Sequence, residues 1–440
     1  MSAVKGARTR LPGAYWRLWT ASAISNTGDG ILAAALPILA TRITDNSLSI
    51  GLISTFFAIP WLLFALPAGT IIDRVDRRSV LIAADLFRGV LVGGLALVAA
   101  FGEVQMWMLW VLAFGLGAGE VFFDSTSQTI LPSIVSSEQL GRANGLRYSA
   151  EITGNTFLGA PLGSLLFAVA VWLPFGVDAT SFVVAALLAA SLRGKFKPDR
   201  AKLDLGWRFE MRQGVRWMWR SKLLRNLAIA LALTNMSFAM AESTFVLFAT
   251  EELGVSDTLF GVLLAMVGAG SVVAGIAGGW LVDKVGRRFA ILVAAFVPVV
   301  TMTAIGSIPV TWWVVLMLTV QAMMITVWSI IAVTLRQQIV PDHLFGRVNS
   351  VYRWFSWGAM PVGAFIGGLV AHRWNLQAPY FVGAAVMLVA YLLVVTHLRE
   401  PAIRAAIAAN NPPEPEDRSG DVTPPHLDRH PIDEALGPLL

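Results

Sequence analysis

Residues 69–78 read GTIIDRVDRR, and 210 positions later residues 279–288 read GWLVDKVGRR. Five of the ten positions are identical, and each copy ends one very apolar stretch and precedes another. A second repeated motif supports this one, because GRAN at residues 141–144 recurs as GRVN at residues 346–349. An offset close to half the chain length predicts two similar halves.

The composition indicates that these halves lie in a membrane. Of 440 residues, 56% are hydrophobic and only 14% are charged, against roughly 25% charged in an ordinary soluble domain. Apolar runs of about 20 residues, long enough to cross a bilayer, are centred near positions 28, 61, 91, 118, 158, 184, 237, 268, 299, 324, 360 and 387. We therefore predict an all-α integral membrane protein with twelve transmembrane helices in two pseudo-symmetric six-helix lobes.

The spacing of these runs divides the chain into four parts. We predict an N-terminal lobe over 1–193, a cytoplasmic linker over 194–222, a C-terminal lobe over 223–400 and a disordered tail over 401–440. The tail is rich in proline and acidic residues, a composition typical of disorder. In the linker, arginines recur every four residues beside apolar positions, which predicts an interfacial amphipathic helix. It either straps the lobes together or serves as a regulatory or lipid-binding site. The arginines are Arg208, Arg212, Arg216 and Arg220.

The basic residues predict the orientation, because Lys and Arg are retained on the cytoplasmic side. They concentrate in the N-terminal segment and in every second loop, whereas the opposite set of loops holds only Arg42 and Arg373. That opposite, external set carries acids instead. These are Glu103, Asp178, Glu251, Glu252 and Asp257. We expect a multi-pass plasma-membrane protein with both termini cytoplasmic. This topology explains the excess of basic over acidic residues in the chain, so we expect no nucleic-acid partner.

Catalytic and metal-binding patterns are not found in the sequence. The chain has no cysteine, and its five histidines are scattered at positions 343, 372, 397, 426 and 430. Nucleophile–base and metal-ligand spacings are both missing. We therefore expect no enzyme activity, no metal and no cofactor.

The duplicated loop resembles the signature of the major facilitator superfamily of secondary transporters, which places it between spans 2 and 3 and again between spans 8 and 9. The resemblance covers about residues 12–400. Leu131, Pro132 and the segment 141–144 after the fourth span are similar to the drug and siderophore exporter branch. The resemblance implies two rocking lobes around a central site.

The resemblance also implies an inter-lobe latch on the cytoplasmic side, which opens during transport. Small glycines allow close helix approach, and acids can face a helix N-terminus of the opposite lobe. The latch set is Gly69, Asp73, Arg77, Arg78, Asp124, Gly279, Asp283, Arg287 and Arg288. In it, Asp124 is a candidate partner for Arg77 or Arg78. The alternative is that the loops only determine topology. The first copy has Asp76 where the second has Gly286, so the two loops can differ in strength.

The fifth span carries Gly154, Gly159, Pro161 and Gly163. This pattern resembles the Gly-Pro motif of antiporters in the superfamily, although Ala160 separates a glycine and a proline that are usually adjacent. A helix kink without bearing on transport direction is the alternative.

Acids inside membrane spans are costly and usually face a cavity, a partner or a proton path. Five lie in the first half and only Glu242 in the second. Asp29, Glu120 and Glu151 are the candidates for proton coupling, with Asp29 first because it lies mid-span beside Ser22 and Asn26. Glu120 lies either in the central cavity or inside the lobe. Asp85 and Arg88 are three residues apart and are predicted to form an ion pair within one helix.

These features together predict a proton-coupled exporter of hydrophobic drugs or secondary metabolites that works by alternating access. Its expected partners are a hydrophobic or amphipathic small molecule, protons and membrane lipid, and we expect a monomer. A siderophore exporter or a small-nutrient symporter or facilitator of the same fold is the alternative. A receptor or scaffold would not require the clustered acids of the first half.

Overall fold

The computed structural model describes residues 10–72, 74–136, 139–192, 207–340 and 342–397, with the single positions 194, 196 and 401. Within these residues the chain is helical and contains no strand. The first half comprises α1 (Gly13–Ile43), α2 (Ser47–Ile72), α3 (Arg77–Phe101), α4 (Met106–Ile130), η1 (Leu131–Ser133), α5 (Leu140–Ile152), η3 (Thr153–Gly159), α6 (Ala160–Val169) and α7 (Leu173–Ala190). The rest comprises α8 (Trp207–Arg220), α9 (Lys222–Glu242), α10 (Phe245–Leu247), η4 (Phe248–Glu252), α11 (Asp257–Val285), α12 (Arg287–Ser307), α13 (Thr311–Ile339), α14 (Asp342–Trp357), α15 (Met360–Arg373) and α16 (Ala378–His397).

Twelve segments of the described chain are long and apolar enough to cross a membrane, which confirms the predicted architecture. Ten are single helices, whereas the fifth and eleventh spans are each built from shorter helices joined end to end. The fifth span passes from α5 through the π-helical segment η3 into α6. The eleventh span turns at Gly358 and Ala359 before α15 begins. Pro161 and Pro361 lie in the first turns of α6 and α15, where a missing N–H is tolerated.

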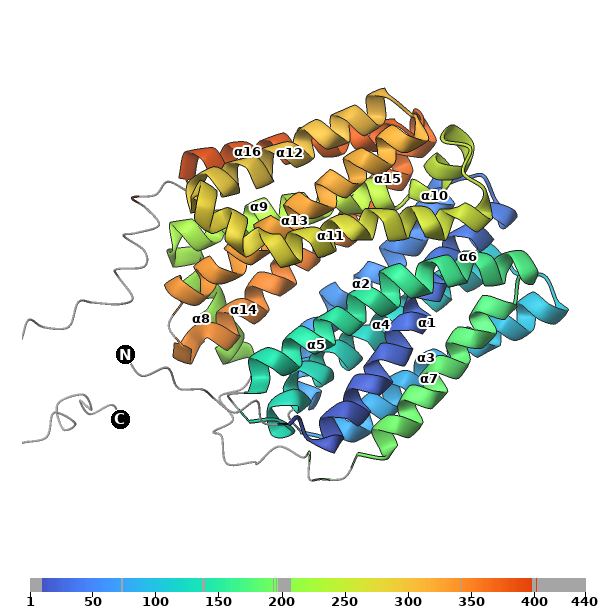
Figure 1. Ribbon diagram of the computed structural model, residues 1–440, viewed down its shortest axis with the longest axis horizontal. Helices are drawn as coiled ribbons and strands as arrows, with labels where there is room; N and C mark the ends of the chain where they lie inside the picture. The colour runs from blue at the N-terminus through green and yellow to red at the C-terminus, as the bar shows by residue number, and fades with distance from the viewer. Residues whose placement is uncertain are drawn as a thin grey trace, which may run out of the picture.

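The spans of each half pack mainly against one another and form two lobes. In Figure 1 the blue-to-green N-terminal lobe lies below the yellow-to-red C-terminal lobe. We call the side of the bundle where α1 begins, α16 ends and α8 lies the α8 side. The other side, where α10 lies, is the α10 side (Figure 1).

A pair of glycine stripes relates the two lobes. In the N-terminal lobe, Gly159 and Gly163 bring the fifth span against the main chain of α1. In the C-terminal lobe, Gly363 and Gly367, each 204 positions later, bring the eleventh span against the main chain of α9. Small residues allow membrane helices to approach this closely. The duplication seen in the loops therefore extends to helix packing.

The amphipathic helix predicted in the linker is present as α8, which packs against α9 and α14 of the C-terminal lobe. Met218 is buried in that contact, and Trp219 meets the ring of Phe355 with 5.8 Å between centroids. Arg212, Arg216 and Arg220 are exposed on the opposite face. The structure does not describe the predicted tail after position 401.

Candidate functional site

A buried arginine in the N-terminal lobe gathers the acids that the sequence singled out. Arg88 of α3 is 2% exposed, and its Nη2 lies 2.7 Å from Asp85 Oδ1, which confirms the predicted ion pair. Its Nη1 lies 3.6 Å from Asp29 Oδ1 of α1, a contact that the sequence did not predict. The guanidinium also lies between the rings of Phe123 and Phe182, at 4.7 and 4.3 Å from their centroids.

Asp178 is a further member of this site, and its sequence assignment was wrong. It was expected in an external loop, yet it lies inside α7 with no exposed surface. Its Oδ1 accepts a hydrogen bond of 3.2 Å from Ser181, whereas its Oδ2 has no partner among the described residues. A Cβ on Gly28 would overlap Asp178 and Ser181, so this acid lies against α1 one residue from Asp29.

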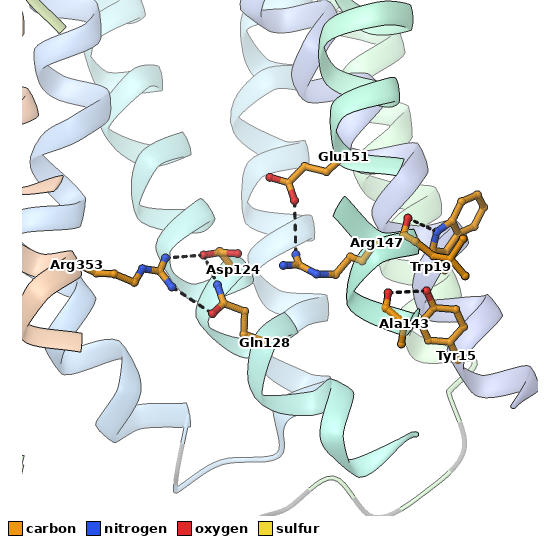
Figure 2. A network of polar contacts seen from close by, with 9 residues as sticks. Tyr15, Trp19, Asp124, Gln128, Ala143, Arg147, Glu151 and Arg353 are labelled. Atoms are coloured by element: carbon orange, nitrogen blue, oxygen red, sulfur yellow. Dashed lines mark hydrogen bonds and ion pairs between the residues drawn. The ribbon is translucent and has the colours of Figure 1, made fainter. Parts of the chain in front are cut away.

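The two other candidates lie on α4 and α5, in different surroundings. Glu120 of α4 is half-buried and lies within electrostatic range of Arg88, Asp29 and Asp124. Its neighbour Gly119 leaves room for Arg88, because a Cβ there would lie 2.6 Å from Arg88 Cγ. Glu151 of α5 is 43% exposed and pairs with Arg147 at 3.7 Å (Figure 2). Glu120 therefore belongs to the group around Arg88, whereas Glu151 is paired with Arg147.

The glycines of the Gly-Pro pattern in the fifth span pack against α1, the helix that carries Asp29. Gly154 and Gly159 lie within η3, where hydrogen bonds between residues five apart replace the four-residue spacing of an α-helix. A Cβ at Gly159 would lie 2.6 Å from both the Cα of Gly30 and the carbonyl oxygen of Thr27. A Cβ at Gly30 would in turn overlap the main chain of Asn155. The helix that carries Asp29 and the π-helical segment are therefore in main-chain contact.

The same broken span also contacts the other lobe, on the α10 side. Ser164 Oγ of α6 accepts a 2.8 Å hydrogen bond from the Gly261 N–H of α11. A Cβ at Gly261 would overlap the carbonyl of Ala160, and one at Gly268 would overlap Thr156. The described contacts of α11 with the fifth span thus involve α6 and η3, and the ribbons of α5 and α11 diverge toward the α8 side (Figure 1).

Two further contacts hold the lobes together on the α10 side. Arg42 of α1 pairs with Asp257 of α11. Gly51 of α2 lies against Gly368 of α15, where an added Cβ would be 2.9 Å from the Gly368 Cα. The α10 side is therefore closed along both seams between the lobes.

On the α8 side the lobes meet between α2, α4 and α14. Arg353 of α14 donates to Asp124 Oδ2 and to Gln128 Oε1, each at 3.1 Å, and Gln128 also donates to Asp124 at 2.8 Å (Figure 2). Trp354 Nε1 donates to the carbonyl of Leu62 at 2.9 Å, and the rings of Trp61 and Trp357 are 4.6 Å apart.

The partner expected for Asp124 was therefore wrong, although Asp124 does lie between the lobes. Its carboxylate accepts from Arg353, whereas the described bonds of Arg77 and Arg78 reach carbonyls of their own lobe. Arg77 Nη1 donates to Thr129 at 3.0 Å, and Arg78 Nη1 donates to Leu192 at 2.9 Å. In the second copy, Arg287 Nη1 donates to Gln338 at 3.1 Å, the equivalent contact between spans 9 and 10.

The rest of the latch set is only partly described. Asp73 lies outside the described residues, and the structure does not describe the side chain of Asp283 or the surroundings of Gly69 and Gly279. Arg288 is exposed at the start of α12. Gly286 has a φ of 86°, a left-handed conformation that glycine adopts readily. At the equivalent position Asp76 has a φ of −66° and caps α3 by accepting from the Arg78 N–H, so the two loops differ in conformation.

Comparison with known proteins gives a family and a set of relatives. A family model described as transmembrane secretion effector matches residues 12–423. The macrolide efflux protein A of Streptococcus pyogenes is 23% identical over 366 residues, which cover 82% of this chain and 89% of that protein. The multidrug efflux pump Tap of Mycolicibacterium fortuitum is 26% identical over 407 residues, which cover 89% of this chain and 97% of that protein.

A solved structure shares the fold. A variant of the nucleoside transporter NupG superposes with a TM-score of 0.74 at 10% identity, over 87% of this chain and 99% of that one. The architecture, the family match and the efflux relatives agree with one another. Because the family model matches nearly the whole chain, the chain belongs to the transmembrane secretion effector family of the major facilitator superfamily, and it is a multi-pass plasma-membrane transporter rather than an enzyme.

Proposed function

We propose that the protein exports hydrophobic or amphipathic drug-like compounds in exchange for protons, by alternating access and as a monomer. The observation that carries the proposal is the group of Asp29, Asp85 and Asp178 around the buried Arg88 in the N-terminal lobe. The names of the relatives, macrolide efflux protein and multidrug efflux pump, support drug-like substrates.

The charge balance of this group supports proton exchange. Three aspartates and the nearby Glu120 act on one guanidinium, and like charges in a low-dielectric interior disfavour simultaneous ionisation. Asp85 forms the shorter of the two ion pairs with Arg88 and is 1% exposed, so it suits the role of a permanent counter-charge to Arg88. The Asp29 side chain is 29% exposed and 3.6 Å from Arg88, so it can exchange a proton with water more readily. We assign Asp29 as the principal proton carrier, with Glu120 and Asp178 as neighbours that share the charge.

The contacts of the fifth span supply a route from protonation to lobe movement. Asp29 lies on α1 beside Gly30, which touches η3, and the continuation of η3 into α6 touches α11 of the other lobe. A change in the charge at Asp29 alters how α1 packs against η3, and η3 is the part of that span that departs from regular α geometry. Protonation of Asp29 thereby changes the stability of the contact between α6 and α11.

We infer that the α8 side is the cytoplasmic side, and in the present arrangement the lobes are in contact on both sides. The α10 side is closed along both seams, whereas on the α8 side the contacts join α2 and α4 to α14. The exposed arginines of α8 would then face lipid headgroups of the cytoplasmic leaflet.

Reconstitution in lipid vesicles tests the proposed function. With an imposed proton gradient, we expect movement of a labelled lipophilic compound against the direction of proton flow, and collapse of the gradient should abolish net accumulation. Substrate moving in the same direction as the protons, with no hydrophobic compound exported, would favour the nutrient symporter. Export of a labelled ferric chelator alone would favour the siderophore exporter.

The orientation predicts a specific labelling pattern. The chain has no cysteine of its own, so Lys284→Cys and Glu103→Cys provide single labelling sites on the α8 and α10 sides. In intact cells, an impermeant maleimide should label Glu103→Cys, whereas Lys284→Cys should react only after permeabilisation. The reverse pattern would show that the α8 side faces outward.

The latch proposal predicts that the double variant Asp73→Asn, Asp283→Asn reduces turnover several-fold without loss of membrane insertion. Each change removes a charge from one copy of the duplicated motif, whereas the apolar sequence of the spans is unchanged. Dye efflux per molecule of membrane-inserted protein measures the effect. A double variant with the normal efflux rate would leave these loops with a role in topology only.

A further inference from the structure

A cavity of about 420 Å³ lies inside the C-terminal lobe, between α9, α12, α13, α14 and α16. Its volume falls in the range of small-molecule sites, roughly 300–1,000 Å³. All of its lining residues belong to this lobe, and most of them lie between the middle of the helices and their α8-side ends. Most of the wall is apolar, with Leu231, Ala294 and Val333 as examples.

The polar part of this wall includes two guanidinium groups and an indole N–H, beside hydroxyl and amide groups. Arg336 of α13 donates to Asn349 Oδ1 at 3.0 Å and to the Ala332 carbonyl at 3.3 Å, and it lies 4.1 Å from the centroid of the Tyr352 ring. No carboxylate pairs with Arg336 among the residues that the structure describes. Arg353 also lines the cavity, and its charge is already balanced by Asp124.

Trp328, which also lines the cavity, has a buried hydrogen-bond donor without a partner among the described residues. Its side chain is 7% exposed, and its Nε1–H has no acceptor within the described part of the chain. A buried donor normally has a partner. An indole N–H at a cavity wall, on the same helix as a guanidinium without a carboxylate, suits a molecule that brings its own acceptors.

We propose that this cavity binds an apolar molecule that carries an anionic or similarly strong acceptor group, with Arg336 and Trp328 as its recognition residues. The body of the molecule fills the apolar wall, and its acceptor end lies toward α13. A cationic amine is disfavoured there, because two guanidinium groups and no acid line the cavity. The lining places such a ligand nearer the α8 side of the C-terminal lobe, apart from the acids around Arg88. Its role as an export substrate rests on the proposed function, whereas its binding does not.

Equilibrium binding to the full-length protein in lipid nanodiscs, without a proton gradient, tests this proposal. Fluorescein and rhodamine 123 share a tricyclic ring system and carry opposite charge, so their fluorescence anisotropy reports the preference of the site. We expect fluorescein to bind more tightly. Arg336→Gln should weaken fluorescein at least about tenfold and leave rhodamine 123 within about twofold. Arg336→Lys should restore most of the affinity.

Trp328→Phe keeps most of the ring volume and removes the donor, so it should weaken fluorescein several-fold. Matched controls are Arg220→Gln, an exposed arginine on α8, and Trp312→Phe, an exposed indole on the α10 side. Neither control should change the affinity of either dye.

The proposal is overturned if rhodamine 123 binds more tightly, if Arg336→Gln weakens both dyes equally, or if Arg336→Lys fails to restore binding. Trp328→Phe with unchanged affinity for fluorescein would also contradict it. If fluorescein still binds but the protein transports no compound in vesicles, the proposed export function is wrong and the proposed binding site stands. If the protein exports compounds in response to a proton gradient but fluorescein binding does not depend on Arg336, the proposed binding site is wrong and the proposed function stands.

Discussion

Replacing Asp29 with asparagine should abolish gradient-driven accumulation while substrate exchange across the membrane continues. The amide keeps the shape and much of the hydrogen bonding of the carboxyl group but cannot ionise. Each proton that moves down one pH unit supplies about 1.4 kcal/mol, which supports about a tenfold concentration ratio of substrate. In vesicles with a gradient of one pH unit, the unmodified protein should approach that ratio for one-proton exchange, and Asp29→Asn should stay at about one.

A matched control separates the loss of a proton carrier from the loss of an acid in general. Glu103→Gln removes a carboxylate from an exposed loop on the α10 side and should accumulate substrate normally. Exchange of labelled for unlabelled substrate without a gradient should proceed in both variants, because that process needs no net proton movement. An undiminished concentration ratio in Asp29→Asn would move the proton role to Glu120 or Asp178.

The membrane architecture was predictable from the sequence because its signals are local. A span requires only a continuous apolar run, and the duplication is visible as matched loops, so the twelve spans and two lobes were correct. The ion pair between Asp85 and Arg88 was predictable for the same reason, since the two residues are three apart on one helix. Local spacing therefore sufficed for the span count and for this pair.

The site was harder to predict because its contacts join distant segments. Asp178 follows Pro174 and Gly176, which read as a loop, although a proline fits the first turn of a helix that begins at Leu173. Asp124 meets Arg353 from 229 positions away, and no local pattern contains that information. By contrast, Gly159 and Gly163 do recur 204 positions later as Gly363 and Gly367, and comparing the two halves would have revealed that contact.

One of these glycine contacts gives the second large expected effect, on both stability and transport. Gly159→Ala should stop export and lower the thermal stability of the purified protein, because the new methyl group would lie 2.6 Å from main-chain atoms of α1. No rotamer change relieves a clash with backbone, and overpacking of this kind costs about 1–3 kcal/mol. To restore contact distances, α1 and η3 must move apart at Gly30, one residue from Asp29.

Gly145→Ala is the matched control on the same span, since a Cβ there meets no other atom within 4 Å. Alanine favours a helix over glycine by about 1 kcal/mol, so Gly145→Ala should keep or slightly raise stability and leave efflux unchanged. Melting temperature in detergent and dye efflux in cells measure the two effects. If Gly159→Ala matched Gly145→Ala in both, contact between α1 and η3 would not be required for transport, and the route from Asp29 to α11 would have to run through another helix.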